Sequence, residues 1–289
     1  MGSTYQELRK KLNQGRRDLA QLEKYLKEGE TLERDIEKNA YLVEERLGKI
    51  EERLAQFEDL KDLREDLQRV REFVEEKKRL LDPAKQTLRN YLGAELDRRF
   101  REQGWQISGN VPELRVGLLT LEFLLTQGQV RIWFGPRIEL LGKARLSVDS
   151  ITDTVTTLYK DLEGASFKDE EEFLRLLFDA YGRCIIREGL APGATLPIIR
   201  WLGEIAWQKQ GTKFLADPRR EHFTSYGRVQ LSYDLFRTKR RQYNDHELRL
   251  GIASREQTKR MEENLWVPQS PRGDGTHFAS VCFISRAPR

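Results

Sequence analysis

The sequence has little cysteine and no long apolar run, and each absence excludes a class of protein. Its 289 residues include only two cysteines, Cys184 and Cys282, too few for a disulfide framework or a four-thiolate zinc site. No run of about 18 apolar residues is present, so we expect no membrane-spanning helix. The first residues, Met1 to Glu7, lead into charged sequence without the apolar stretch of a secretory signal. We therefore expect a cytoplasmic protein with no membrane contact.

Histidine is also scarce, which weakens the case for catalysis or metal binding. None of the three histidines has a His or Cys neighbour at the spacing of a zinc site. Asp149 and Asp153 lie one helical turn apart at a helix start and could hold Mg²⁺, but the positive end of the helix dipole explains them better. We expect no cofactor and no bound metal. Enzymatic function is the less favoured interpretation; the enzyme class considered is a metal-dependent nuclease or hydrolase.

Proline is absent from Tyr5 to Asp82, and apolar residues there recur at alternating steps of four and three. This spacing is typical of the seam of a coiled coil, so we predict a coiled-coil rod over residues 1–82. A three-residue step after Phe57 should overwind the supercoil locally. The predicted oligomerisation residues are Ile36, Val43, Leu47, Ile50, Leu54, Phe57, Leu63, Leu67, Val70 and Val74.

A rod with one apolar stripe needs a partner for that stripe. Either two copies pair, or the chain folds back near Gly29 as an antiparallel hairpin, and we favour self-association. Pro83 should end or kink the rod, because a proline inside a helix removes a hydrogen bond. A connecting helix is predicted over residues 83–104, ending at Gly104.

From Trp105 onward, short β-rich runs and turn residues alternate with amphipathic stretches, which predicts an α+β domain over residues 105–289. Helices are expected at 147–162, 169–188 (opened by a capping box at 166–169), 196–214 and 255–264. Strands are expected at 114–125, 130–134 and 277–284. Strict alternation of apolar residues at 229–235 and at 248–252 predicts a long β-hairpin within residues 226–253.

The charge of the molecule is concentrated in this hairpin region. The whole chain carries a net charge of +4, whereas residues 209–260 hold 13 Lys and Arg against 6 Asp and Glu, a net +7. The order helix, turn, helix, hairpin resembles a winged helix in topology, a fold in which the hairpin lies along DNA phosphates. Cations with adjacent aromatic rings suit phosphate neutralisation and base stacking. The predicted nucleic-acid-binding residues are Arg237, Lys239, Arg240, Arg241, Tyr243, Lys259 and Arg260.

Together these features favour a non-enzymatic protein whose rod mediates self-association or docking and whose C-terminal domain binds DNA or RNA. Such a build would suit an accessory subunit of a complex acting on DNA or in defence. Readout of specific bases is not expected, because the helix over 196–214 carries Trp201, Leu202 and Ile205 and must be largely buried. The main alternative is a pure protein–protein scaffold.

Overall fold

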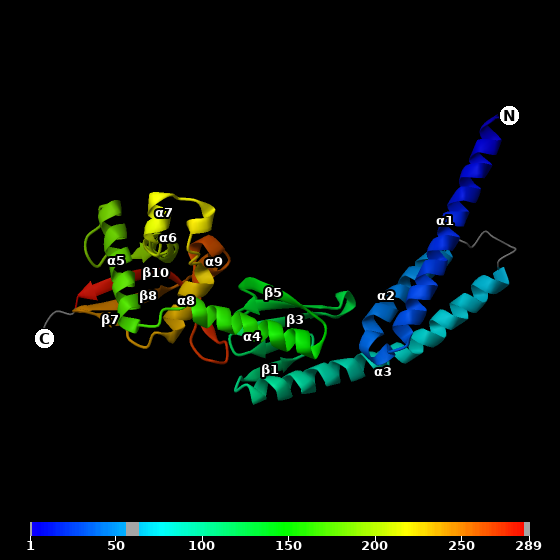
Figure 1. The fold of residues 1–289 in the computed structure, drawn as a ribbon, viewed down its shortest axis with the longest axis horizontal. Helices are drawn as coiled ribbons and strands as arrows, with labels where there is room; N and C mark the ends of the chain where they lie inside the picture. Colours follow the sequence, from blue (N-terminus) through cyan, green and yellow to red (C-terminus); the bar gives the residue numbers. More distant parts are fainter. Residues whose placement is uncertain (1, 56–63, 286–289) are drawn as a thin grey trace.

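A computed structural model describes residues 2–55 and 64–285, and side-chain surroundings for 16–55, 68, 71, 72 and 74–285. Over the described residues the chain combines α-helices with two antiparallel sheets. Figure 1 shows the N-terminal helices at one end, the first sheet in the middle, and residues 170–285 at the other end. The mixed α and β class expected from the sequence is confirmed.

The N-terminal arm consists of α1 (Gly2–Glu33), α2 (Ile36–Ala55) and α3 (Arg64–Glu102). The ion pairs Arg53–Asp18 (3.2 Å) and Arg46–Glu28 (3.0 Å) join α2 to α1 with residue numbers running in opposite directions. Helices α1 and α2 are therefore antiparallel. Lysines of α3 pair in the same antiparallel sense with Glu44 and Glu51 of α2.

The chain reverses at Arg34 and Asp35, not near Gly29, where the alternative of an antiparallel hairpin places the turn. Gly29 lies inside α1, where a glycine weakens a helix by only about 1 kcal/mol and does not have to break it. At the actual turn, the side chain of Asn39 donates to the carbonyl of Leu32 over 3.0 Å. Lys38 also pairs with Asp35 at 2.7 Å.

The predicted seam is buried within a single chain. Val43, Leu47, Ile50 and Leu54 of α2 are only 1–3% exposed, and the arm core that they form includes Val74 of α3. Ile36 is half-buried beside this core. Phe57 and Leu63 lie outside the described residues. The side chains of Leu67 and Val70 are not described, although their backbone belongs to α3.

Helix α3 continues through Pro83, contrary to the expectation that this proline separates a rod from a connecting helix. From Leu81 onward its buried positions, spaced three or four residues apart, are Leu81, Ala84, Leu88, Leu92, Leu96 and Phe100. Leu81 and Ala84 belong to the arm core, and the other four to the next core along the chain. We attribute the survival of the helix to this continuous packing, because a proline inside a helix costs about 3 kcal/mol. One helix thus joins two cores.

The first sheet is an antiparallel meander in the order β1-β2-β3-β4-β5. Its strands are β1 (Ile107–Asn110), β2 (Glu113–Val116), β3 (Leu119–Leu124), β4 (Gln129–Phe134) and β5 (Glu139–Arg145). The single strand expected over 114–125 is divided by a turn at Gly117, which has a positive φ of 56°. Tyr159 holds this turn, because its hydroxyl accepts from Leu118 N (2.7 Å) and donates to Val116 O (2.8 Å).

Helix α4 (Val148–Ala165) packs against this sheet and begins at the predicted position, with Ser147 as N-cap. The short helix η2 (Leu125–Gln127) joins β3 to β4. The first core lies among the sheet, α4 and the second half of α3.

Residues 166–285, called the second unit here, contain a second antiparallel sheet in the order β6-β10-β8-β7, with β9 also paired to β10. Its strands are β6 (Leu196–Pro197), β7 (Gln242–Tyr243), β8 (His246–Ile252), β9 (Leu265–Pro268) and β10 (Gly275–Ser285). Its helices are α5 (Glu170–Glu188), α6 (Ile198–Gln208), α7 (Thr212–Ala216), η3 (Arg220–His222), α8 (Arg228–Arg237), α9 (Arg255–Thr258) and η4 (Met261–Glu263).

Helix α5 matches the prediction closely, with a different cap. Asp169 is the N-cap and accepts from Glu171 N at 2.9 Å, whereas Ser166 donates back to Leu162 O at the end of α4. The prediction of a single helix over 196–214 is wrong. Leu196 and Pro197 form β6, α6 begins only at Ile198, and Gly211 lies between α6 and α7. The helix expected over 255–264 is likewise two short turns, α9 and η4.

Residues 228–237 form helix α8, and the β-strand predicted there is wrong. Residues two apart on a helix lie about 200° apart, so an alternating apolar pattern can mark two opposite buried faces. Val229 and Tyr233 belong to the first core, whereas Leu231 and Leu235 belong to the second core, between α5, α6 and the second sheet. Helix α8 therefore lies between the two cores. Only the short β7–β8 pair remains of the predicted hairpin.

Candidate nucleic-acid interface

Four of the six predicted basic residues lie at the C-terminus of α8 and in the segment that leads from it to β7. Arg237 is the last residue of α8, where a cation interacts favourably with the helix dipole, and its guanidinium lies 5.8 Å from the Tyr233 ring centroid. Lys239 follows the cap residue Thr238 and is exposed. The hydroxyl of Thr238 donates to Asp234 O at 2.7 Å and so fixes the helix end.

Arg240 and Arg241 already have partners within the chain. Arg240 Nη1 lies 2.6 Å from Glu171 Oε2, and the backbone N–H of Arg240 donates to Glu170 Oε1 at 2.9 Å. The side chain of Arg241 turns inward, and its Nη2 donates to Leu235 O at 3.0 Å. Burial lowers the pKa of the Arg241 guanidinium. Neither side chain is free to contact a phosphate without giving up these bonds.

The remaining three predicted residues are also engaged. Tyr243 packs beside the second core, with its ring centroid 5.5 Å from that of Phe178. Lys259 pairs with Glu256 at 2.9 Å and Arg260 with Glu263 at 2.6 Å, around α9 and η4. Sequence reasoning could count these charges, but it could not see that acidic neighbours pair with them.

A hollow of about 170 Å³ brings Arg237 and Lys239 together with Lys168, which the sequence did not single out. We call it the cationic groove. Lys168 lies in the turn between α4 and α5, about 70 residues earlier in the chain. All three cations are exposed, and none forms an ion pair with a carboxylate of the described residues. Glu170 also lines the groove, with its Oε1 accepting from Arg240 N.

Asp234 holds the two sides of the cationic groove together. Its carboxylate is 2% exposed and accepts from Phe167 N at 3.2 Å, next to Lys168 in the α4–α5 turn. It also accepts from the hydroxyl of Tyr226 at 2.8 Å. Burial raises the pKa of Asp234, against the lowering effect of these hydrogen bonds. The bonds to Asp234 thus fix the turn that carries Lys168 against the helix that ends at Arg237.

A further cation, Lys209, is half-buried beside two aromatic rings. The Lys209 ammonium is 4.1 Å from the ring centroid of Phe167 and 4.4 Å from that of Tyr226. Burial lowers the pKa of Lys209, while the nearby charge of Asp234 acts in the opposite direction. These cation–π contacts favour the protonated amine and explain why Lys209 can be half-buried.

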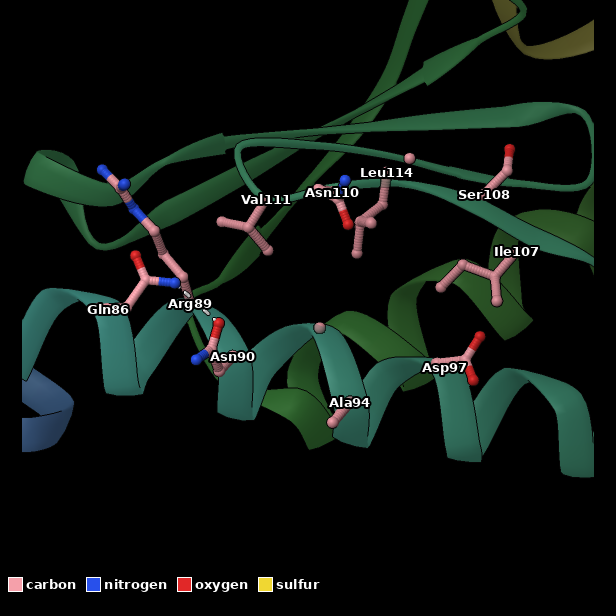
Figure 2. A pocket seen from close by; sticks show the side chains of 12 residues that line it. Gln86, Arg89, Asn90, Ala94, Asp97, Ile107, Ser108, Asn110, Val111 and Leu114 are labelled. Carbon is pink, nitrogen blue, oxygen red and sulfur yellow. Dashed lines mark hydrogen bonds between the residues drawn. The ribbon is translucent and has the colours of Figure 1, made fainter.

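A different hollow, of about 570 Å³, lies between α3 and the β1–β2 hairpin (Figure 2). Val111 and Leu114 point into it from the hairpin, opposite the polar side chains of α3. Of those polar groups, Gln86 donates to Asn90 at 2.9 Å and Asp97 accepts from Arg101 at 2.7 Å, whereas the buried Nε of Arg89 has no hydrogen-bond partner among the described residues. Ser108 and Asp97 both line the hollow, but no hydrogen bond joins them in the described part of the chain.

The residues considered for metal-dependent catalysis do not converge. Asp149 lies in the first turn of α4 and pairs with Arg99 of α3 at 2.9 Å, while Asp153 is exposed one turn later. Within residues 2–55 and 64–285, no group of three or more His, Cys, Asp or Glu side chains is placed to hold a metal ion. In the same residues, no helix combines the length and apolar character needed to cross a bilayer.

Comparison with known proteins finds no match: no family model fits the sequence, and no curated protein or solved structure is significantly similar to it.

Proposed function

We propose that the second unit binds the phosphate backbone of a nucleic acid at the cationic groove. The observation that carries this proposal is that Lys168, Arg237 and Lys239 line one hollow and form no ion pair among the described residues. Phosphate contacts by such cations release counterions and supply most of the affinity of non-specific binding. Three other cations predicted from the sequence are better explained as partners in ion pairs within the chain, namely Arg240, Lys259 and Arg260.

The order of elements in the second unit supports a winged-helix-like interpretation. The elements that correspond to a winged helix occur along the chain in the order α5, β6, α6, α8, β8 and β10, with shorter elements between some of them. Their order in the sheet is β6-β10-β8. In a winged helix, the helix before the hairpin enters the major groove. Here that helix is α8, which is packed on both sides by the two cores. We therefore propose backbone binding without base readout.

We further propose that the arm is a coiled-coil-like docking element that joins this nucleic-acid-binding end to a larger complex. Support comes from α3, whose buried stripe runs from the arm core into the first core and links both ends mechanically. Because the α2 seam is covered by α1 and α3, self-association would have to use other surfaces of the arm.

The test is the salt dependence of binding to a DNA duplex. Each phosphate contact contributes about 0.9 to the slope of log K against log salt, so replacing Lys168, Arg237 and Lys239 together by Gln should reduce the slope by about 2.7. At about 0.1 M salt, this corresponds to a loss of affinity on the order of 500-fold.

The matched control removes the same number of charges elsewhere in the second unit. Replacing Arg255, Lys259 and Arg260 together by Gln should change the slope by less than about 1, because two of these cations are already paired with carboxylates. Equal losses in the two triple variants, or no duplex binding by the unaltered protein at low salt, would refute the cationic groove as the site.

A further inference from the structure

Exposed aromatic rings gather at the end of α6, on α7 and after η3. Trp207 is 54% exposed, Phe223 is 50% exposed and Leu215 is 58% exposed. Phe214 lies between the two large rings, with its centroid 6.0 Å from that of Trp207 and 5.6 Å from that of Phe223. Both contacts are edge-to-face, at 82° and 63°, so Phe214 does not stack on either ring. We call these four residues the aromatic patch.

The aromatic patch is not part of the packing of the second unit. None of its four residues belongs to the second core, which is formed by α5, α6, α8 and the second sheet. Single exposed apolar residues are common on protein surfaces, but a contiguous exposed group marks an interaction site. Trp207 and Phe223 each leave about half of their surface to solvent, which is enough to accept a planar group on a ring.

Cations accompany the aromatic patch. Between positions 209 and 223 the chain holds four Lys and Arg against two Asp and Glu. Arg219 is paired with Asp217 at 2.8 Å, whereas Lys213 and Arg220 are exposed and form no ion pair with the described residues. A partner that suits this surface carries negative charge and flat apolar faces together.

We propose that the aromatic patch binds single-stranded nucleic acid, with bases stacking on Trp207 and Phe223 and phosphates near Lys213 and Arg220. Aromatic stacking beside a cationic track is the general mode of sequence-tolerant single-strand binding. Inside a duplex the faces of the bases are stacked on one another, so a duplex cannot use the rings in this way. This inference rests on the proposed function and assigns a second site and a strand preference to the same unit.

Trp207 provides a direct reporter of binding. It is the one clearly exposed tryptophan of the five, since Trp201 and Trp266 are at most 2% exposed and Trp105 and Trp133 are intermediate. Titrating the full chain with an oligothymidylate should quench the solvent-exposed part of the tryptophan emission. A duplex of the same length should produce little quenching. Trp207→Phe should abolish the signal while retaining most of the affinity, because a phenyl ring still stacks.

The decisive variant is Trp207→Ala combined with Phe223→Ala. Loss of stacking should weaken oligothymidylate binding by about 5- to 150-fold for each base released, and duplex binding by less than about twofold. The matched control is Ile186→Ala combined with Ile252→Ala, which removes two side chains that are 81% and 74% exposed elsewhere on the second unit. The control should bind both ligands as the unaltered protein does.

The outcomes separate this inference from the proposed function. Duplex binding without tryptophan quenching by the single strand would overturn the inference and leave the cationic groove standing. Single-strand binding that depends on Trp207 and Phe223 but not on the cationic groove would support the inference and overturn the cationic groove as the site. Sedimentation at several concentrations covers the remaining case: a self-association that disappears in the double-Ala variant would identify a second copy as the partner and overturn the inference.

Discussion

Two adjacent leucines on α3 test whether the arm core forms within one chain. Leu81 is 2% exposed and belongs to the arm core, whereas Leu80 is 51% exposed. Replacing either one by Ala makes the same chemical change in the same turn of the helix, with almost the same effect on helix propensity. The pair therefore isolates burial as the variable.

The expected magnitudes follow from the exposed fractions. A buried Leu→Ala substitution removes apolar contact and leaves a cavity, and together these destabilise by about 2–5 kcal/mol. We expect Leu81→Ala to lie within this range, because the side chain is almost fully buried between α3 and α2. Leu80→Ala should cost less than about 1 kcal/mol, because half of its surface already faces water and no cavity forms.

Hydrogen exchange measured by mass spectrometry reports the protection of backbone amides in the arm separately from that in the two sheets. The measurement therefore does not assume that the whole chain unfolds in a single transition. Peptides from α2 and α3 should lose protection in Leu81→Ala and keep it in Leu80→Ala. Protection of the arm should also be independent of protein concentration, since a core formed within one chain gains nothing from mass action. Protection that rises with concentration, or that falls more in Leu80→Ala than in Leu81→Ala, would refute the intramolecular core.

The remaining predictions concern the second unit. Burial, reinforced by the charge of Arg228, lowers the pKa of His277, so the contribution of this residue to stability is complete above the unfolded pKa of about 6.5 and is lost as pH falls through the folded pKa. In urea titrations, His277→Gln should therefore lose less stability than the unaltered protein between pH 7 and pH 5. Equal losses in the two proteins would contradict this. Gly273 has φ of 82°, and a Cβ there would lie 2.7 Å from Gly117 O, so Gly273→Ala should lower the free energy of unfolding, measured by urea titration, by more than about 1 kcal/mol. Gly203→Ala, in α6 with open space around its Cβ position, should instead stabilise by about 0.5–1 kcal/mol, and a loss there would contradict the placement of this residue in a regular helix.

Helices with one buried face and ordinary end signals could be predicted from the sequence. Helix α4 begins after Ser147 and α5 ends at Gly189, which adopts the left-handed conformation with φ of 64°. Both signals are local, so no knowledge of the fold is needed to read them. The spacing of Val43, Leu47 and Ile50 likewise identified a buried stripe correctly. It could not say what covers the stripe, because the packing of a second copy and of a neighbouring helix have the same periodicity.

The candidate site was only half predictable. Arg237 and Lys239 stand out in the sequence as part of a basic run, but Lys168 is an isolated lysine in a turn and joins them only through folding. The carboxylates of Glu170 and Glu171 that engage Arg240 come from the first turn of α5, directly after Lys168 in the chain. Counting charges along the chain therefore identifies neither Lys168 as part of the site nor Arg240 as already neutralised by carboxylates.

Helix α8 shows why the strand prediction failed and what the failure means for function. An alternating pattern usually places one face of a strand in a core and the other in water, which would leave residues 228–235 with a polar face for a ligand. On a helix, the same pattern buries two opposite faces, and the two most enclosed polar residues become structural. Ser232 donates to Trp266 O at 2.6 Å, and Asp234 accepts from Phe167 N and the Tyr226 hydroxyl. The helix that would read bases in a winged helix is thus committed to holding two cores together. Any nucleic-acid contact must then come from what α8 positions at its end, namely Arg237 and Lys239, and from surfaces away from it.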